Sequence, residues 1–190
     1  GIKHLEGSGN FIEASRGYSN LGNVQIQMGD LDDAGSSLLR SIEKAKEKGR
    51  YDYWWPSINM INLFAMKGKL KEGEEVFESV IEQIKERDDK IGLAIAHMYF
   101  GNIRSLSGNT EEGETLLVRS ISILDSLGVI YDLSRGRLYL GEHYIRTGNE
   151  EEARNLIKEA YDSFKSIGAK FMAEKARERL IRMRGDNGFI

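Results

Sequence analysis

Apolar residues recur three and four positions apart in successive runs along this chain, with polar and charged residues between them. This spacing places the apolar residues of each run on one face of an α-helix. Short polar segments that contain glycine separate the runs. Proline breaks helix interiors, and the chain has one proline in 190 residues, so we expect long helices. The predicted helices cover residues 10–28, 31–48, 52–67, 70–87, 90–107, 110–127, 131–147, 150–167 and 170–184.

The first eight predicted helices form four pairs, and a similar tight turn joins the two helices of each pair. We call the helix before this turn helix A and the helix after it helix B. The turns are centred on Gly29, Gly68, Gly108 and Gly148, which lie 39, 40 and 40 residues apart. Glycine after a helix readily takes the left-handed conformation that ends the helix. Self-similarity at such a period is typical of solenoids, in which repeated helix pairs stack in sequence.

Small residues recur at fixed places in both helices of a pair. Gly22, Gly101 and Gly141 each stand seven residues before a turn glycine, inside helix A. A glycine in a helix interior costs about 1 kcal/mol relative to alanine, so we expect a close helix contact there. The expected partners stand five residues after the turn glycines, in helix B. They are Ala34, Gly73, Gly113 and Ala153.

The residues that follow the turn glycines favour the start of a helix. Asp30, Asn109 and Asn149 have side chains that suit the N-terminal cap of helix B. Acidic residues then crowd the first turn of helix B, where they complement the positive end of the helix dipole. Both features place the beginning of helix B directly after the turn.

The small residue in helix A, the turn glycine and the small residue in helix B resemble the pattern of tetratricopeptide repeats (TPRs). The phrases Asn20-Leu21-Gly22-Asn23 and Tyr99-Phe100-Gly101-Asn102 are similar to the long variety of this repeat. That variety is found in kinesin light chains, in mitotic Leu-Gly-Asn-repeat adaptors and in the MalT-like region of signalling ATPases and regulators. The resemblance covers nearly the whole chain. It implies an all-α fold, a right-handed α-solenoid of helix-turn-helix repeats whose helices A line the concave face.

These observations predict a single TPR-like domain over residues 1–190. Gly9 precedes Gly22 by 13 residues, as Gly128 precedes Gly141, so the first residues resemble the end of a helix B. We interpret residues 1–9 as the tail of a preceding helix B or as an irregular cap, and we expect a fragment of a larger protein. The predicted repeats are 10–49, 50–88, 89–128 and 129–168, followed by a capping helix at 169–185 and a tail at 186–190.

Asparagine recurs at one position of helix A. This position holds Asn23, Asn62 and Asn102, and the fourth repeat has Glu142 instead. Asparagine is a poor residue for a helix interior, so its recurrence needs a reason. The resemblance implies one, because the kinesin light chain and mitotic adaptor families use an asparagine ladder to bind the backbone of an extended peptide. We expect these side chains to point into open space along one groove wall; the alternative is that they cap neighbouring helices or face water.

Other side chains of the expected concave face would add specificity. Aromatic and methionine side chains are suited to adaptable peptide contacts, although they can also pack between helices as core. Toward the C-terminus the face becomes basic, which suits an acidic segment or a terminal carboxylate; a solvated face of mixed charge is the alternative. The further candidate peptide-binding residues are Asn20, Trp55, Asn59, Met98, Tyr99, Arg135, Tyr139, Arg146, Lys175, Arg179 and Arg182.

No arrangement of residues predicts catalysis, a cofactor or a metal site. The chain has no cysteine, and His4, His97 and His143 lie on separate elements without metal-ligand spacing. The glycine-rich residues 7–10 lack the lysine of a phosphate-binding loop. We therefore expect no enzyme activity, no cofactor and no metal, and we interpret His97 and His143 as packed helix residues.

Composition narrows the expected partners. A net charge of -3 does not favour nucleic acid, no apolar run is long enough to span a bilayer, and the N-terminus lacks the apolar region of a signal peptide. We expect a cytoplasmic module that binds a protein or peptide segment, acidic at the basic end, with self-association left open and no direct contact with nucleic acid or membrane. The alternative is a regulatory or oligomerisation arm of a larger signalling ATPase or transcriptional regulator.

Overall fold

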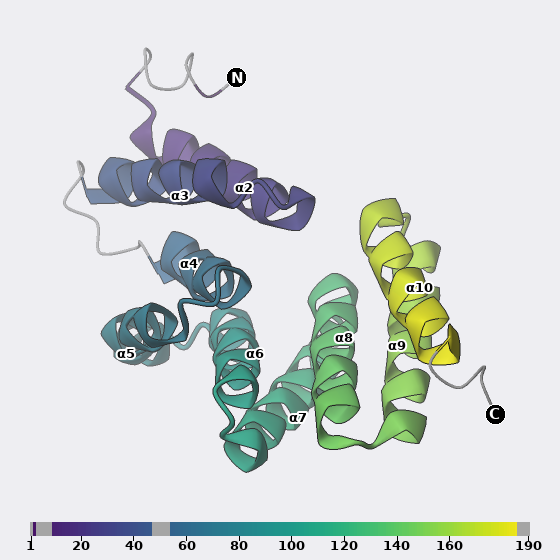
Figure 1. Cartoon of the computed structure of the whole chain (residues 1–190). Coiled ribbons are helices and arrows are strands. Elements are labelled where there is room, and N and C mark those ends of the chain that lie inside the picture. Colours follow the sequence, from purple (N-terminus) through teal and green to yellow (C-terminus); the bar gives the residue numbers. More distant parts are fainter. Residues whose placement is uncertain (1, 3–8, 47–53, 186–190) are drawn as a thin grey trace. The chain divides into compact units, whose positions relative to one another are not determined.

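Nine helices and no strand are found in the computed structural model, which describes residue 2 and residues 9–46 and 54–185 (Figure 1). The prediction of an all-α chain is confirmed. The helices are α2 (Phe11–Met28), α3 (Leu31–Lys46), α4 (Trp54–Met66), α5 (Leu70–Glu86), α6 (Lys90–Leu106), α7 (Thr110–Ser126), α8 (Ile130–Thr147), α9 (Glu150–Ser166) and α10 (Lys170–Gly185).

Each predicted helix is present, and apart from the two ends next to residues 47–53 every helix end lies within one residue of its prediction. The predicted ends at residues 48 and 52 lie outside the described residues. Pro56 falls in the first turn of α4, where the missing N–H group would have no partner within the helix. The apolar periodicity and the turn glycines therefore locate the helices well.

The tight turns end helix A through glycine in the left-handed conformation. The φ angle is 89° at Gly29 and 86° at Gly148. After Gly29, the N–H group of Asp30 donates to the carbonyl oxygen of Gln25 at 2.9 Å, which satisfies one of the free carbonyls at the helix end. Only a residue without a side chain takes such a φ angle at little cost, so glycine marks these turns in the sequence.

The predicted side-chain caps are wrong at two of the turns. Asn109 and Asn149 do occupy the N-cap positions of α7 and α9, but neither side chain makes a capping hydrogen bond. The backbone carbonyl of Asn109 accepts instead from the N–H group of Gly113 at 3.0 Å. Both asparagines are exposed, so water can satisfy the first N–H groups of these helices.

Gly22 and Gly141, inside helix A, lie against helix B of the same pair, as predicted, and the contact of Gly101 stays a prediction. A Cβ atom added to Gly22 would lie 2.7 Å from Cγ of Leu38 and 3.3 Å from the carbonyl oxygen of Ala34. A Cβ atom added to Gly141 would lie 3.2 Å from the carbonyl oxygen of Ala153. These distances are shorter than normal carbon contacts, so glycine lets the two helices approach.

The chain forms two compact units, Gly1–Ile103 and Arg104–Ile190. The first contains α2 to α5 and most of α6, and part of its core joins α2, α3 and α4. The second contains α7 to α10, and a core cluster around Phe164 joins α8, α9 and α10. Each core therefore lies between helices of successive pairs, as in repeat proteins. The single domain and its repeat boundaries stay a prediction.

Candidate peptide-binding site

Four charged side chains from two helices of the second unit lie close together. Glu142 and Arg146 come from α8, and Lys175 and Arg179 come from α10. The Nε atom of Arg179 donates to Oε1 of Glu142 at 2.7 Å. We call these four residues the basic cluster, because they comprise three cations and one carboxylate; Glu178 of α10 also lies near Lys175. All four were predicted as binding residues, and the structure brings them together.

The basic cluster holds positive charge that is only partly compensated. Burial lowers the pKa of the Lys175 ammonium; Glu142 and Glu178 oppose this shift, and the charge of Arg179 adds to it. Burial also lowers the pKa of Arg146, again with Glu142 opposing and Arg179 adding to the shift. A second negative group placed among these cations would reduce their mutual repulsion. The cluster is therefore suited to bind an anionic group.

The other predicted residues of α8 are already engaged within the second unit. Arg135 is buried, and its Nη2 atom donates to Oδ1 of Asp132 at 2.6 Å. Its guanidinium also lies over the ring of Tyr131, 5.4 Å from the centroid. Burial raises the pKa of the Tyr139 hydroxyl to about 12, so this hydroxyl stays protonated. The charge of Arg135 is thus paired with Asp132, and the Tyr139 hydroxyl carries no charge.

A hydrogen-bonded chain of side chains leads from the basic cluster into the core. The Nη2 atom of Arg146 donates to Oγ of Ser105 at 2.7 Å, and this Oγ lies 2.7 Å from Nδ1 of His143. Because Ser105 accepts from Arg146, its own proton can point at Nδ1, which then accepts. The protonated Nε2 atom of His143 then faces Oε2 of Glu114 at 3.6 Å. The hydroxyl of Tyr144 donates to the other oxygen of Glu114 at 2.7 Å.

This set of a serine, a histidine and a glutamate does not form a nucleophilic site. Ser105 and His143 are both buried, and Ser105 Oγ is held by an arginine. Burial lowers the pKa of His143, although Glu114 opposes the shift, so the ring is neutral at neutral pH. A catalytic serine needs access to its substrate and a base that can take its proton. The prediction that His143 is a packed helix residue is confirmed.

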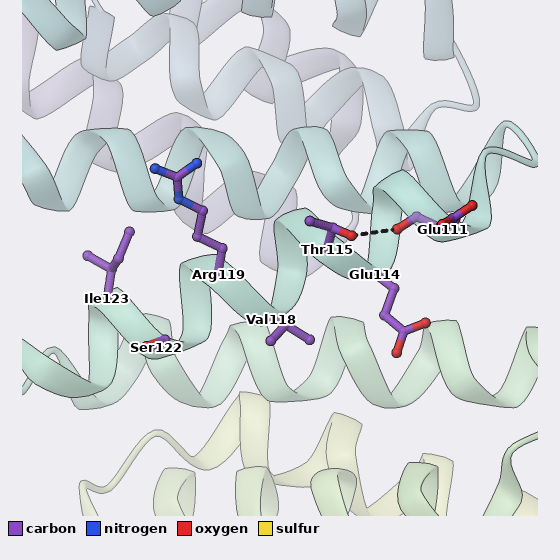
Figure 2. Close-up of a pocket in the computed structure, with 7 residues that line it drawn as sticks. All are labelled: Glu111, Glu114, Thr115, Val118, Arg119, Ser122 and Ile123. Atoms are coloured by element: carbon purple, nitrogen blue, oxygen red, sulfur yellow. Dashed lines mark hydrogen bonds between the residues drawn. The ribbon is translucent and has the colours of Figure 1, made fainter.

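Glu114 also lines a shallow hollow along α7 (Figure 2). The hollow has a volume of about 630 Å³, and Figure 2 shows its lining side chains along one helix. The Thr115 hydroxyl donates to the carbonyl oxygen of Glu111 at 2.9 Å, so one polar group is used within the helix. The sequence predicted no site here, and no set of polar groups converges on one point. The lining residues are Glu111, Glu114, Thr115, Val118, Arg119, Ser122 and Ile123.

The recurrent asparagines of the first unit lie mostly within the helix packing. Asn62 is 3% exposed and Asn102 is 5% exposed. The Oδ1 atoms of Asn23 and Asn102 are buried and have no hydrogen-bond partner among the described residues. Asn59 Nδ2 donates to the hydroxyl of Ser19 at 3.2 Å. The expectation of open space therefore does not hold for Asn62 and Asn102, because neighbouring side chains cover them, and a role in ligand binding stays a prediction.

The remaining candidates divide into buried and exposed side chains. Met98 and Tyr99 are fully buried, so they present no surface to a ligand in this structure. Trp55 on α4 and Asn20 on α2 are exposed, as is Arg182 on α10. The exposed side chains are accessible, as contact with a binding partner requires.

Neither a metal site nor a membrane-spanning helix is present in the described ranges. No group of three or more histidine, cysteine, aspartate or glutamate side chains there could hold a metal ion. None of the helices described is long and apolar enough to cross a bilayer.

Comparison with known proteins links this arrangement to a fold. No family model and no curated protein matches the chain. Among solved structures, BtubC from P. vanneervenii is 14% identical with a TM-score of 0.62, over 100% of this chain and 87% of its own. A P. anserina protein described as a kinesin light chain with nearly identical TPR-like repeats is 13% identical with a TM-score of 0.56, over 91% of this chain and 95% of its own.

A third structure belongs to a larger protein. It is a Signal Transduction ATPase with Numerous Domains (STAND) protein with a TPR sensor, from Pyrococcus horikoshii, 17% identical with a TM-score of 0.59. The match covers 87% of this chain but 26% of that chain. The chain has the TPR fold. It is an all-α solenoid fold of helix-turn-helix repeats, as the resemblance implied. Because the sequence identities are low, the similarity to these structures shows the fold alone.

Sequence reasoning missed the chain of side chains behind the basic cluster. Ser105 and His143 are 38 residues apart and come from consecutive helices A, while Glu114 comes from the helix B between them. One signal was available: His143 occupies the repeat position that holds Leu63 and Ile103 in earlier repeats. A polar residue at an apolar repeat position is a reason to look for buried partners.

Proposed function

We propose that this chain is a protein-binding module that holds an extended acidic segment on the exposed surfaces of α8 and α10. The observation that carries the proposal is the basic cluster, in which Arg146, Lys175 and Arg179 surround Glu142, and Glu178 adds a second negative charge near Lys175 only. The TPR fold suggests a scaffold for protein partners, and the cluster adds the charge of the segment that is bound.

The two arginines of the cluster are held in place before a ligand arrives. Arg146 is fixed by its hydrogen bond to Ser105, and Arg179 is fixed by Glu142. A guanidinium keeps further N–H groups when one is used, so each arginine can still donate to a carboxylate. Fixed donors lose less entropy on binding than mobile ones. An acidic side chain or a terminal carboxylate would therefore bind more tightly, because both arginines are held in place and still have N–H groups to donate.

In the first unit, we assign ligand contacts to the exposed candidates Asn20 and Trp55 and to the partly exposed Asn59. The buried asparagines Asn62 and Asn102 act in helix packing. Asparagine offers both a donor and an acceptor, so a ligand role would need these groups to reach the surface. The proposal therefore gives the basic cluster the larger share of the binding energy.

Fluorescence anisotropy of a glutamate-rich peptide and its glutamine counterpart tests the proposal. The parent should bind the glutamate peptide and not the glutamine peptide. Lys175→Gln/Arg179→Gln should weaken binding roughly 100-fold or more, since two charge-assisted hydrogen bonds are lost and each contributes about 1.5–3 kcal/mol net of the competition from water. Arg119→Gln/Lys158→Gln is the matched control, because it removes the same charge from the exposed surfaces of α7 and α9. Equal loss in both variants would reject a local site.

The alternative function is a regulatory or oligomerisation arm of a larger signalling ATPase or regulator. The likeness to the TPR sensor of a STAND protein favours it, and so does the 26% of that protein's chain that the match covers. The two functions differ in what the helix A surface binds. Concentration-dependent self-association that removes peptide binding would favour the oligomerisation arm.

A further inference from the structure

The first described helix, α2, exposes a row of apolar side chains. Leu21, Val24 and Met28 are all exposed, and their spacing places them on one helix face. Gly17 extends this face by one turn toward the start of the helix. We call these four residues the α2 stripe. Single exposed apolar residues are common, so comparison with the other repeats decides whether the stripe has a meaning.

The central position of this face, that of Val24, is covered in every later repeat. Val24 stands five residues before its turn glycine, and the equivalent residues are Leu63, Ile103 and His143. Val24 is 49% exposed, whereas the three equivalents are 2%, 0% and 1% exposed. The difference lies in what surrounds the position, since the residue types in the first three repeats are all aliphatic.

Helix B of the preceding repeat covers this position in the later repeats. Leu63 of α4 lies against Gly35 of α3, where an added Cβ atom would be 3.6 Å from its Cδ2. Ile103 of α6 fills the space beside Gly73 of α5. His143 of α8 faces α7. The α2 stripe is thus the surface on which the repeat pattern places a helix B.

The contact between α5 and α6 shows what such a helix presents. The ring of Phe77 on α5 stacks on Phe100 of α6, with centroids 3.9 Å apart and planes within 4°. Phe100 is the equivalent of Leu21, and Gly73 lies one turn from Phe77 on α5. The occupant of the α2 stripe therefore needs a large apolar side chain opposite Leu21 and a small residue opposite Val24.

The position of Ile2 indicates where such a helix would lie on α2. Ile2 is helical, and its Cγ1 atom lies 2.9 Å from the position of a Cβ atom on Gly17. In the next repeat, Lys67 beyond the end of α4 pairs with Asp32 at the start of α3 at 2.6 Å, so helix B runs antiparallel to the following helix A. A helix that contains Ile2 in this arrangement would run along Leu21 and Val24. We propose that the α2 stripe is the docking surface for an amphipathic α-helix of this kind, continuous with Ile2.

The test supplies such a helix and follows the exposure of Val24. A copy of residues 70–80, the first part of α5, is joined ahead of Ile2 in place of Gly1, so that the copies of Gly73 and Phe77 come opposite Val24 and Leu21. Val24→Cys is introduced into both the extended and the 190-residue chain. The natural chain has no cysteine, so a thiol reagent reports on this position alone. The added helix should slow modification roughly tenfold or more, because reaction then requires local opening. Leu39→Cys on α3 is the matched control, at a position 53% exposed, and its rate should not change.

Three results would overturn the proposal. The first is an unchanged modification rate at position 24 in the extended chain. The second is equal protection from an added helix in which the copies of Gly73 and Phe77 are replaced by lysine, since that helix lacks the residues that face the stripe. The third is sedimentation showing that the 190-residue chain dimerises and that Val24→Glu dissociates it, which would assign the stripe to a second copy.

Discussion

Asn102 on α6 and Arg146 on α8 belong to the same series of helices A, yet their surroundings differ. Asn102 is 5% exposed, and its amide oxygen is reached by no donor among the described residues. Arg146 lies at the surface and is held by Ser105 from one side only. The amide of Asn102 is enclosed between helices, whereas the guanidinium of Arg146 reaches the surface near Arg179 of α10. Recurrence of a residue type in a repeat therefore does not by itself identify a binding residue; the exposure of its polar atoms is needed too.

The largest expected effect concerns packing that both units share. Gly22→Leu in the first unit and Gly141→Leu in the second should each cost about 1–3 kcal/mol of unfolding free energy, because the new side chain would enter the facing helix B. Gly35→Ala is the control, since its Cβ atom meets only Leu63 at 3.6 Å, and it should gain up to about 1 kcal/mol from helix propensity. Urea unfolding measures all three. Parent-like stability of both leucine variants would contradict the close-contact argument.

The asparagine half of the comparison is tested by Asn102→Leu. A buried amide oxygen without a partner costs about 1–3 kcal/mol, and leucine has the same number and branching of side-chain heavy atoms as asparagine. We expect this variant to be as stable as the parent or more stable by about 1 kcal/mol, measured by thermal unfolding. A clear loss of stability would show that the amide makes interactions that packing alone does not explain.

The buried chain behind the basic cluster predicts a pH dependence. Burial lowers the pKa of His143 in the folded state, so the unfolded chain takes up a proton at higher pH than the folded chain does. Stability should therefore fall as pH drops below about 6.5, the ordinary pKa of histidine. His143→Gln should remove this part of the pH dependence, whereas His97→Gln should keep it. The same pH profile for His143→Gln and the parent, from urea unfolding at several pH values, would contradict the assignment of a neutral ring.

The smallest expected effect on stability concerns the carboxylate of the basic cluster. Glu142→Gln removes the ion pair with Arg179, whose side chains are partly exposed, so it should cost less than about 1 kcal/mol. The same change should strengthen binding of the glutamate-rich peptide, because Glu142 competes with the ligand for the three cations. Anisotropy titration checks this second effect. Weaker binding in Glu142→Gln would mean that Glu142 orients Arg179 more than it competes.

The helices were predictable from the sequence because the same turn pattern marks the equivalent helix boundary in each of the four repeats. Gly29, Gly68, Gly108 and Gly148 mark one turn in four places, and apolar periodicity agrees with them. The contacts of the glycines inside helix A followed from the cost of glycine in a helix. In these cases, local chemistry decides the structure, so a local pattern is sufficient to predict it.

The exposure of the candidate site residues was less predictable. Asn62 and Asn102 share a repeat position with Asn23, and the sequence does not show how deeply neighbouring helices cover each of them. The grouping of Glu142 with Arg179 follows from the contact between α8 and α10, which are 37 residues apart at this point. Spacing within one helix predicted the stripe of Lys175 and Arg179, but contacts between repeats decide which charges are shared.

The most direct measurement is a titration of the glutamate-rich peptide at low and high salt against three proteins. They are the parent, Lys175→Gln/Arg179→Gln and Asn62→Ala/Asn102→Ala. The account predicts that the parent and the asparagine variant bind alike and lose affinity as salt rises, because exposed charges are screened, while the charge variant binds weakly at both salts. A loss of about 5- to 150-fold in the asparagine variant, independent of salt, would instead show that the asparagines hold the ligand and would contradict the account.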